Sequence, residues 1–286
     1  MPTVDVAGVS IYYEEEGSGD PLVFVHGIPT DYRAWMAQVE AFSKGRRVIS
    51  LSRRYAHPNQ RQGDVSDSTV QNNAVDLSGF IEKVVGGKAD VVGHSYGGFI
   101  SALLAADHPD VVKSLVLVEP AVSTLLVADQ TSSAQAFGLL LRSPSVALSG
   151  RRFQTQSLGP SLRALDAGEN ERAVELNVDG IQDRKGAFRE LPEESRRMML
   201  DNARTVAELR TRFPRFTVKE AGLITCPTLV VNGEQSALYL RKIGDLLAGA
   251  IPGAKRAVVP GSRHFPHMEN PELFNSIVLG FLEGKP

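Results

Sequence analysis

Short apolar runs alternate with longer helical segments along most of this chain, and no other feature constrains its fold as strongly. Six runs are apolar enough for burial on both faces, as in the interior strands of a parallel sheet: LVFVHG, RRVISLS, ADVVG, KSLVLVE, TCPTLVVNG and KRAVVPG. Helical patterns follow them near 31–43, 67–84, 95–108, 236–249 and 271–283. This alternation predicts a mostly parallel sheet with helices on both faces. Two short strands joined near Gly8 precede it.

The alternation stops between residues 121 and 212, which hold amphipathic segments but no strand of that kind. Such a stretch is too long for a loop and predicts a helical unit beside the carboxyl ends of the strands, where open α/β sheets bind ligands. We therefore expect an α/β core over 1–122 and 216–286 and a helical cap over 123–215. Helices are expected at Leu139–Leu148, Ser161–Leu165, Glu171–Ile181 and Glu193–Arg210. Core packing is the expectation for most apolar residues of two stripes: Leu139, Leu140, Leu141, Val146, Leu148, Met198, Met199 and Leu200.

Charge and composition exclude several classes of protein. Lys plus Arg number 31 and Asp plus Glu 33, a net charge of −2, which argues against a nucleic-acid partner held by phosphate contacts. The N-terminus has no basic and apolar leader, and no run is long enough to span a membrane, so we expect a cytoplasmic protein. The single cysteine, Cys226, excludes an internal disulfide and a cysteine-rich metal site, and it reads as a buried thiol.

The strongest local signal is Gly93-His94-Ser95-Tyr96-Gly97, which directly follows an apolar strand and directly opens a helix. A G-x-S-x-G string becomes specific in this strand–turn–helix context, because the strained turn lifts the serine hydroxyl clear of the sheet. Any side chain at either outer glycine is expected to collide with the neighbouring strand or helix. Ser95 is therefore the candidate nucleophile.

Three separated motifs together make the chain resemble the α/β-hydrolase superfamily over nearly its whole length. His26-Gly27-Ile28-Pro29 resembles the oxyanion loop of that superfamily, GHSYG its nucleophile elbow, and PGSRHFPHMENP the segment with its catalytic histidine. The resemblance implies the α/β-hydrolase fold, with a helical cap inserted after the strand that ends near Glu119. It also implies that the backbone N–H groups of Ile28 and Tyr96 form the oxyanion hole.

A serine nucleophile needs a general base, and histidine suits that role because its pKa lies near working pH. His264 follows the last strand at the carboxyl edge of the sheet, and the family's base occupies the matching place. His267 is the runner-up, with packing near the start of the last helix as its alternative role. His57 receives no catalytic role, and Arg54 is interpreted as bracing nearby loops.

The sequence departs from the family at the acid that must orient this histidine. Most relatives carry an Asp in a G-x-x-D pattern, but here Gly233-Glu234-Gln235-Ser236 places a serine at that position. The preferred substitute is Glu119, because some branches of the superfamily carry their acid after this strand. Glu234 is the second candidate.

A serine at the elbow disfavours dehalogenase and epoxide hydrolase chemistry, which use an aspartate there in this fold. We expect a serine hydrolase that cleaves an ester-type acyl bond of a small apolar substrate through an acyl-enzyme, with no metal or cofactor. A non-catalytic ligand-binding protein on the same fold and a carbon–carbon bond hydrolase or lyase remain as alternatives.

Overall fold

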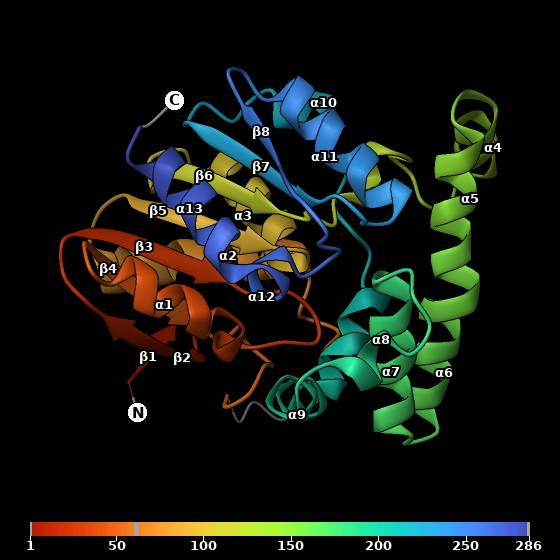
Figure 1. Ribbon diagram of the computed structural model, residues 1–286, viewed down its shortest axis with the longest axis horizontal. Helices are drawn as coiled ribbons and strands as arrows, with labels where there is room; N and C mark the ends of the chain where they lie inside the picture. The colour runs from red at the N-terminus through yellow and green to blue at the C-terminus, as the bar shows by residue number, and fades with distance from the viewer. Residues whose placement is uncertain (1, 60–62, 285–286) are drawn as a thin grey trace.

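The computed structural model describes residues 2–59 and 63–284, and a single eight-stranded sheet runs through its centre (Figure 1). The strand order is β1-β2-β4-β3-β5-β6-β7-β8. β1 and β2 pair antiparallel, β2 pairs antiparallel with β4, and every later pairing is parallel. The strands are β1 (Thr3–Val6), β2 (Val9–Glu16), β3 (Asp20–Val25), β4 (Arg46–Leu51), β5 (Ala89–His94), β6 (Val112–Val118), β7 (Thr228–Gly233) and β8 (Lys255–Val259).

Helices cover both faces of this sheet, as the alternating pattern predicted. α1 and α13 pack together on one face, and α2 and α3 pack together on the other (Figure 1). The helices of the core are α1 (Met36–Phe42), α2 (Val70–Phe80), α3 (Tyr96–Asp107), α10 (Val218–Ala221), α11 (Leu238–Ala250), α12 (Pro266–Glu269) and α13 (Pro271–Leu282). A 3₁₀ turn, η1 (Tyr32–Trp35), precedes α1 and is capped by the side chain of Asp31. The prediction of a mostly parallel α/β fold is confirmed.

The helical insertion lies between β6 and β7, at one end of the molecule in Figure 1. It contains α4 (Ser133–Arg142), α5 (Pro144–Phe153), α6 (Gly159–Asp166), α7 (Asn170–Ile181), α8 (Ala187–Glu190), α9 (Glu193–Asp201) and the 3₁₀ segment η5 (Ala203–Arg210). Two of the expected helices are broken: the one at Leu139–Leu148 falls across α4 and α5, and the one at Glu193–Arg210 is divided into α9 and η5. Ser143 and Pro144 separate α4 from α5, since a proline favours the first turn of a new helix. The boundaries of a separate cap at 123 and 215 stay a prediction.

The expectation of core packing is wrong for part of the apolar stripes in this insertion. Met198 and Met199 are buried, but Leu141 is 69% exposed, Leu148 is 57% exposed, and Leu140 and Leu200 are also exposed. The reason is the placement of α4 and α5, which pack on each other at the outside of the molecule (Figure 1) and contain no buried residue. An amphipathic pattern predicts an apolar face, but it does not say what covers that face.

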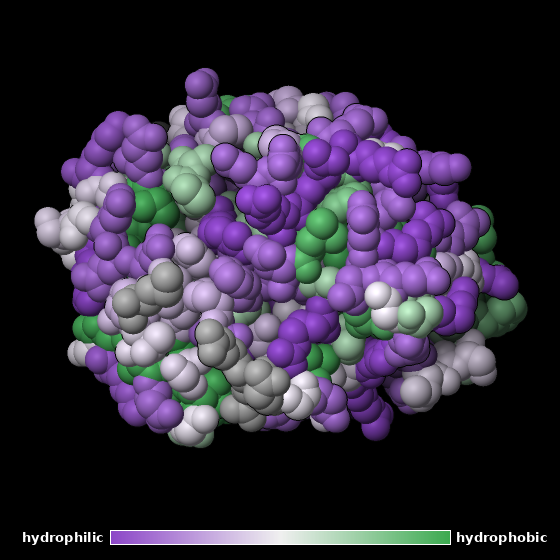
Figure 2. Space-filling view, turned by 90° about the horizontal axis from the view of Figure 1, so that it is seen from below, coloured by the Kyte–Doolittle hydropathy of each residue, from purple (hydrophilic) through white to green (hydrophobic). Residues whose placement is uncertain are grey.

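The remaining surface is mixed in character. The face shown in Figure 2 is mostly hydrophilic, with apolar side chains scattered in small groups. Across residues 2–59 and 63–284, no helix is both long and apolar enough to cross a membrane. Cys226 is a buried free thiol, as expected, and burial raises its pKa.

Candidate active site

Ser95 lies at the sharp junction where β5 ends and α3 begins. Its φ of +53° is in a region that non-glycine residues rarely adopt, so the turn is strained. Backbone hydrogen bonds hold it there: Ser95 N donates to Val118 O over 2.9 Å, and Ser95 O accepts from Ala121 N over 3.0 Å. The side chain therefore stands at the carboxyl edge of the sheet, in line with the strained serine turn that the sequence predicted.

The glycines on either side of Ser95 are required by space. A Cβ at Gly97 would lie 2.4 Å from Val25 O, and a Cβ at Gly93 would lie 2.5 Å from Gly97 O. These distances are well inside van der Waals contact, and the obstructing atoms are backbone. The prediction that any side chain here would collide with its neighbours is confirmed, and the close approach brings the end of β3 against the elbow.

His264 lies in the loop between β8 and α12, and its backbone is held from both directions. Its N–H donates to the side-chain oxygen of Gln182, at the end of α7 in the insertion, over 2.9 Å. Its carbonyl oxygen is 2.8 Å from Nε2 of His94, which donates to it. Burial lowers the pKa of His94 well below its usual value, so this ring is neutral. The insertion and the elbow thus jointly fix the position of His264.

The structure brings Ser95, His264 and Glu119 together in one buried line. Nε2 of His264 is 3.0 Å from Oγ of Ser95, and Nδ1 of His264 is 3.3 Å from Oε2 of Glu119. A carboxylate only accepts hydrogen bonds, so Nδ1 carries the hydrogen and Nε2 is free to accept from the serine hydroxyl. Ser95 is 3% exposed, and His264 and Glu119 are fully buried. The arrangement can take a proton from the hydroxyl and stabilise the charged ring that results.

The other carboxylate oxygen of Glu119 is held by three donors from the end of β7 and the turn after it. Nδ2 of Asn232, N of Gly233 and Oγ of Ser236 each donate to Oε1 over 2.7 Å. Glu119 also has a φ of +48°, a second strained backbone position beside the elbow. Ser236, which stands where the resemblance led us to expect an Asp, therefore binds the carboxylate of Glu119. The sequence did not reveal these donors.

The runner-up residues lie elsewhere. Glu234 is exposed, and its carboxylate accepts from N of Gly261 at a turn. His267 is fully buried beside Trp35 and His94, where burial lowers its pKa to about 3. Neither of its ring nitrogens has a hydrogen-bond partner among the residues that the structure describes.

The loop after β3 contains Ile28, whose backbone N–H is expected at the oxyanion hole. The carbonyl oxygen of Gly27 accepts from Nδ1 of His26 over 2.8 Å and from Nη2 of Arg53 over 3.3 Å. The two cis bonds among the described residues are Ile28–Pro29 and His57–Pro58, so the Gly27–Ile28 peptide is trans. In a trans peptide, N–H and C=O point in opposite directions. The N–H of Ile28 therefore points away from Arg53.

This loop also lies directly against the nucleophile turn. A Cβ built on Gly27 would lie 3.0 Å from Cβ of Ser95. Tyr96 is the first residue of α3, a position whose N–H has no partner within a helix, and its hydroxyl is anchored on Ser68 O at 2.8 Å. Both backbone groups expected at the oxyanion hole thus flank Ser95.

Arg53 and Glu208 form a buried ion pair behind this loop that sequence reasoning missed. Nη1 of Arg53 is 2.6 Å from Oε2 of Glu208, which comes from η5 in the insertion. Burial raises the pKa of Glu208, and the guanidinium opposes that rise. Arg54, the residue that the sequence singled out, instead braces α2 through Asp76 at 2.8 Å.

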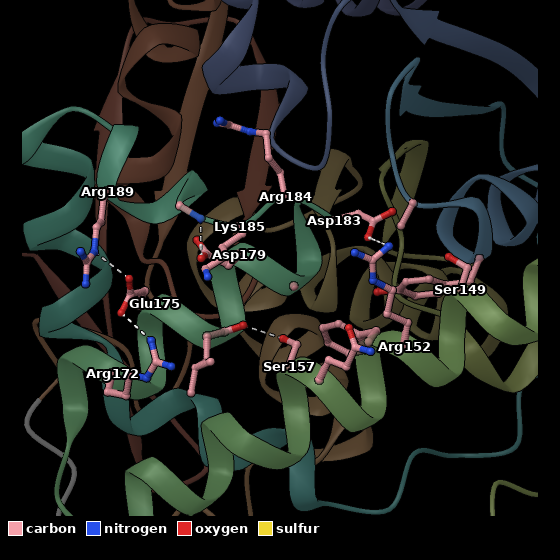
Figure 3. Close-up of a pocket in the computed structure, with 17 residues that line it drawn as sticks. Ser149, Arg152, Ser157, Arg172, Glu175, Asp179, Asp183, Arg184, Lys185 and Arg189 are labelled. Atoms are coloured by element: carbon pink, nitrogen blue, oxygen red, sulfur yellow. Dashed lines mark hydrogen bonds and ion pairs between the residues drawn. The ribbon is translucent and has the colours of Figure 1, made fainter.

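A cavity lies in the insertion, and Ser95, His264 and Glu119 are not among the residues that line it. It measures about 570 Å³ and is lined by α5, α7, the segment 183–186 and the start of α11 (Figure 3). Its charged side chains are largely paired with one another: Glu175 binds Arg172 and Arg189, and Arg152 faces Asp183. In the described part of the chain, no three His, Cys, Asp or Glu side chains are grouped to hold a metal ion.

Comparisons with known proteins agree with this architecture. The 2-(acetamidomethylene)succinate hydrolase of Mesorhizobium japonicum is 24% identical over 284 residues, covering 98% of this chain and 94% of the relative. The (E)-2-((N-methylformamido)methylene)succinate hydrolase of Acinetobacter baylyi is 23% identical over 281 residues, covering 96% and 95%. Among solved structures, a thermophilic esterase from Thermogutta terrifontis superposes with a TM-score of 0.70 at 24% identity, covering 99% of this chain and 96% of the esterase.

The sequence profile of a whole family also matches. The family described as "alpha/beta hydrolase fold" covers residues 20–271, from the first parallel strand to the start of the last helix. That range contains the elbow, the oxyanion loop, the insertion and the histidine loop described above. The chain therefore belongs to the α/β-hydrolase fold family and is a hydrolase of that fold.

Proposed function

We propose that this chain is a serine hydrolase that cleaves an ester-type acyl bond of a small molecule through an acyl-enzyme. Ser95 is the proposed nucleophile, His264 the general base and Glu119 the acid that orients and balances the histidine. The observation that carries the proposal is the continuous line from Ser95 Oγ to His264 Nε2, at 3.0 Å, and from His264 Nδ1 to Glu119 Oε2, at 3.3 Å. Such a line is what activates a serine hydroxyl.

In the first half of the reaction, Oγ of Ser95 attacks the carbonyl carbon of the substrate while its proton passes to Nε2 of His264. The carbonyl oxygen becomes an oxyanion, and the N–H groups of Ile28 and Tyr96 are the proposed donors to it. Fixed donors at this point are worth roughly 2.7–4 kcal/mol each. The bond to the leaving group then breaks, and the imidazolium gives its proton to the departing oxygen.

In the second half, water enters and His264 takes one of its protons. The hydroxide oxygen bonds to the acyl carbon, the bond to Oγ of Ser95 breaks, and the proton returns to the serine. Glu119 keeps Nδ1 protonated throughout and stabilises the positive ring through Oε2. This course needs no metal or cofactor.

Amide hydrolysis is a second candidate, because the substrates in the names of both hydrolases above carry an amide group, acetamido in one and N-methylformamido in the other. The same three residues would serve it, but the proton would go to a departing nitrogen. A matched panel of an ester, an amide and a β-diketone with the same acyl group separates these activities and the carbon–carbon alternative by their kcat/KM values. The proposal is supported if the ester is the best of the three.

Replacing Ser95 with Ala tests the role of the nucleophile directly. We expect Ser95→Ala to lower kcat for a 4-nitrophenyl ester by roughly 10³-fold or more. Ser114→Ala is the matched control, because Ser114 is also buried but bonds Asp90 within the sheet, remote from the site. Full turnover by Ser95→Ala, or an equal loss in both variants, would contradict the proposal.

A further inference from the structure

We propose that Arg53 is a positioning residue that aligns both donors of the oxyanion hole, and that Glu208 holds it from the insertion. Seating of the insertion on the sheet is then coupled to the alignment of the reaction centre. The inference rests on the proposed function of Ser95 and goes beyond it, because Arg53 and Glu208 touch no reacting atom.

The side-chain hydrogen bonds of Arg53 to the oxyanion loop are both made to carbonyl oxygens. Arg53 is the second residue after the end of β4, and its side chain is 2% exposed. Its Nε donates to His26 O over 3.2 Å, and its Nη2 donates to Gly27 O over 3.3 Å. One rigid guanidinium fork thus binds two successive peptide planes, which a single point charge cannot orient in the same way.

These contacts set the direction of the Ile28 N–H. Because the Gly27–Ile28 peptide is planar and trans, holding the Gly27 carbonyl toward Arg53 holds the Ile28 N–H on the opposite side. The same carbonyl also accepts from Nδ1 of His26 over 2.8 Å, from Oγ1 of Thr30 over 3.3 Å and from N of Thr30 over 3.5 Å. Loss of the Arg53 contact would therefore weaken, rather than abolish, the restraint on rotation of this peptide plane. Gly27 has no side chain to restrict such a rotation.

Arg53 also touches the residue that provides the second donor. Its guanidinium carbon lies 4.9 Å from the centre of the Tyr96 ring. The backbone N of Arg53 donates to Nε2 of His26 over 3.0 Å, which leaves Nδ1 of that ring to donate to Gly27 O. Burial and the charge of Arg53 lower the pKa of His26 well below its usual value, in agreement with a neutral ring. A single side chain is therefore in contact with both sides of the expected hole.

Glu208 binds Nη1, the remaining nitrogen of the Arg53 guanidinium. The carboxylate is fully buried, and it comes from η5, about ninety residues after β6 in the chain. A buried ion pair is a poor source of stability, because desolvation offsets its attraction. We therefore assign the pair an orienting role: it fixes the fork on the loop only when η5 is in place.

The experiment compares Arg53→Met with Arg54→Met in the full-length chain. Both changes remove a buried arginine with paired carboxylates, but Arg54 binds Asp76 and Asp67 and does not touch the loop. We expect Arg53→Met to lower kcat for a 4-nitrophenyl ester by about 10- to 100-fold, with KM within about twofold of wild type. Arg54→Met should keep kcat and lose thermal stability alone.

Two further variants keep the test decisive if Arg53→Met does not fold. Arg53→Lys retains the charge but not the fork, and Glu208→Gln retains the shape but not the charge. Both should lower kcat and weaken binding of a boronic acid, which mimics the tetrahedral state, more than they weaken binding of a ground-state product. The inference is overturned if kcat of these variants equals that of Arg54→Met, or if only KM changes.

Labelling of Ser95 by a fluorophosphonate separates this inference from the proposed function. If wild type is labelled at Ser95 and the Arg53 variants turn over normally, the positioning role alone is wrong. If wild type is not labelled and Ser95→Ala remains active, the proposed function itself is wrong, and no role in aligning an oxyanion hole remains for Arg53.

Discussion

Oγ of Ser236 donates a hydrogen bond to Oε1 of Glu119 over 2.7 Å, so the residue in the family's usual acid position holds the carboxylate that we propose as the acid. Nδ2 of Asn232 and N of Gly233 bind the same oxygen. The three donors leave Oε2 directed at His264. The proposed acid therefore follows β6 in this chain, whereas the family's usual acid follows β7. Its carboxylate contacts Nδ1 of His264.

Because Ser236 contacts the carboxylate of Glu119, we expect an acid at position 236 to come within reach of His264 as well. We expect Glu119→Gln to lower kcat by about 10³- to 10⁴-fold, since a neutral amide cannot balance the imidazolium. Glu119→Ser should be similarly impaired, and adding Ser236→Asp to it should recover at least about tenfold of kcat. Steady-state rates with a 4-nitrophenyl ester measure both effects. A double variant no faster than Glu119→Ser would show that position 236 cannot serve His264.

At Ile28, the backbone N–H should matter more than the side chain. Ile28→Ala keeps the N–H and should change kcat little, whereas Ile28→Pro removes it and should cost about 10²- to 10³-fold in kcat. Thermal unfolding of both variants controls for damage to the loop. Equal losses in the two variants would indicate that packing of the Ile28 side chain, rather than its amide, is what the site uses.

Gly97 should tolerate no side chain, because a Cβ there would lie 2.4 Å from Val25 O. We expect Gly97→Ala to lower the free energy of unfolding by about 1–3 kcal/mol and to reduce activity, since β3 leads into the oxyanion loop. Gly249→Ala is the control: no atom lies within 4 Å of its Cβ, and alanine should be neutral or stabilising in α11. Urea unfolding measures both, and a Gly97→Ala protein as stable as wild type would contradict the geometry.

His267 should make the folded state sensitive to acid. Its pKa is lowered to about 3 by burial, so below pH of about 6.5 the unfolded chain binds a proton that the folded chain does not. Stability should therefore fall as pH drops through this window, by about 1.4 kcal/mol per pH unit for this group. His267→Phe should reduce that slope in urea titrations, whereas replacing the exposed His108 with Asn should not. An unchanged slope in His267→Phe would exclude His267 as the cause.

The fold was predictable because its signals are local and repeated. Each buried parallel strand is a continuous apolar run, and the turn at Ser95 carries glycines at 93 and 97, where a Cβ would collide with neighbouring backbone. The exposed face of α4 was not predictable in the same way. Burial of Leu141 depends on which elements lie beside it, and a periodic pattern carries no information about that.

At the site, the residue types at the ends of the strands could be read from the sequence, but the contacts between them could not. Glu119 was chosen because some branches of the superfamily carry their acid after this strand, and the structure places its carboxylate 3.3 Å from Nδ1 of His264. The donors behind Glu119 and the link from Arg53 to Glu208 join segments 113 to 155 residues apart. Sequence reasoning interpreted Arg54 as bracing nearby loops, and Arg54 does bind Asp67 in the loop before α2. Nothing local marks Arg53, the neighbouring arginine, as the one that binds the loop after β3.

The most direct test of the central claim is the mass of the enzyme during turnover. A 4-nitrophenyl ester is mixed with the protein, the reaction is quenched in acid, and the peptide that contains Ser95 is analysed by mass spectrometry. The account predicts an added mass of one acyl group on Ser95, absent in Ser95→Ala and present in Ser114→Ala. Turnover at the wild-type rate with no acyl group on Ser95 at any time would contradict it.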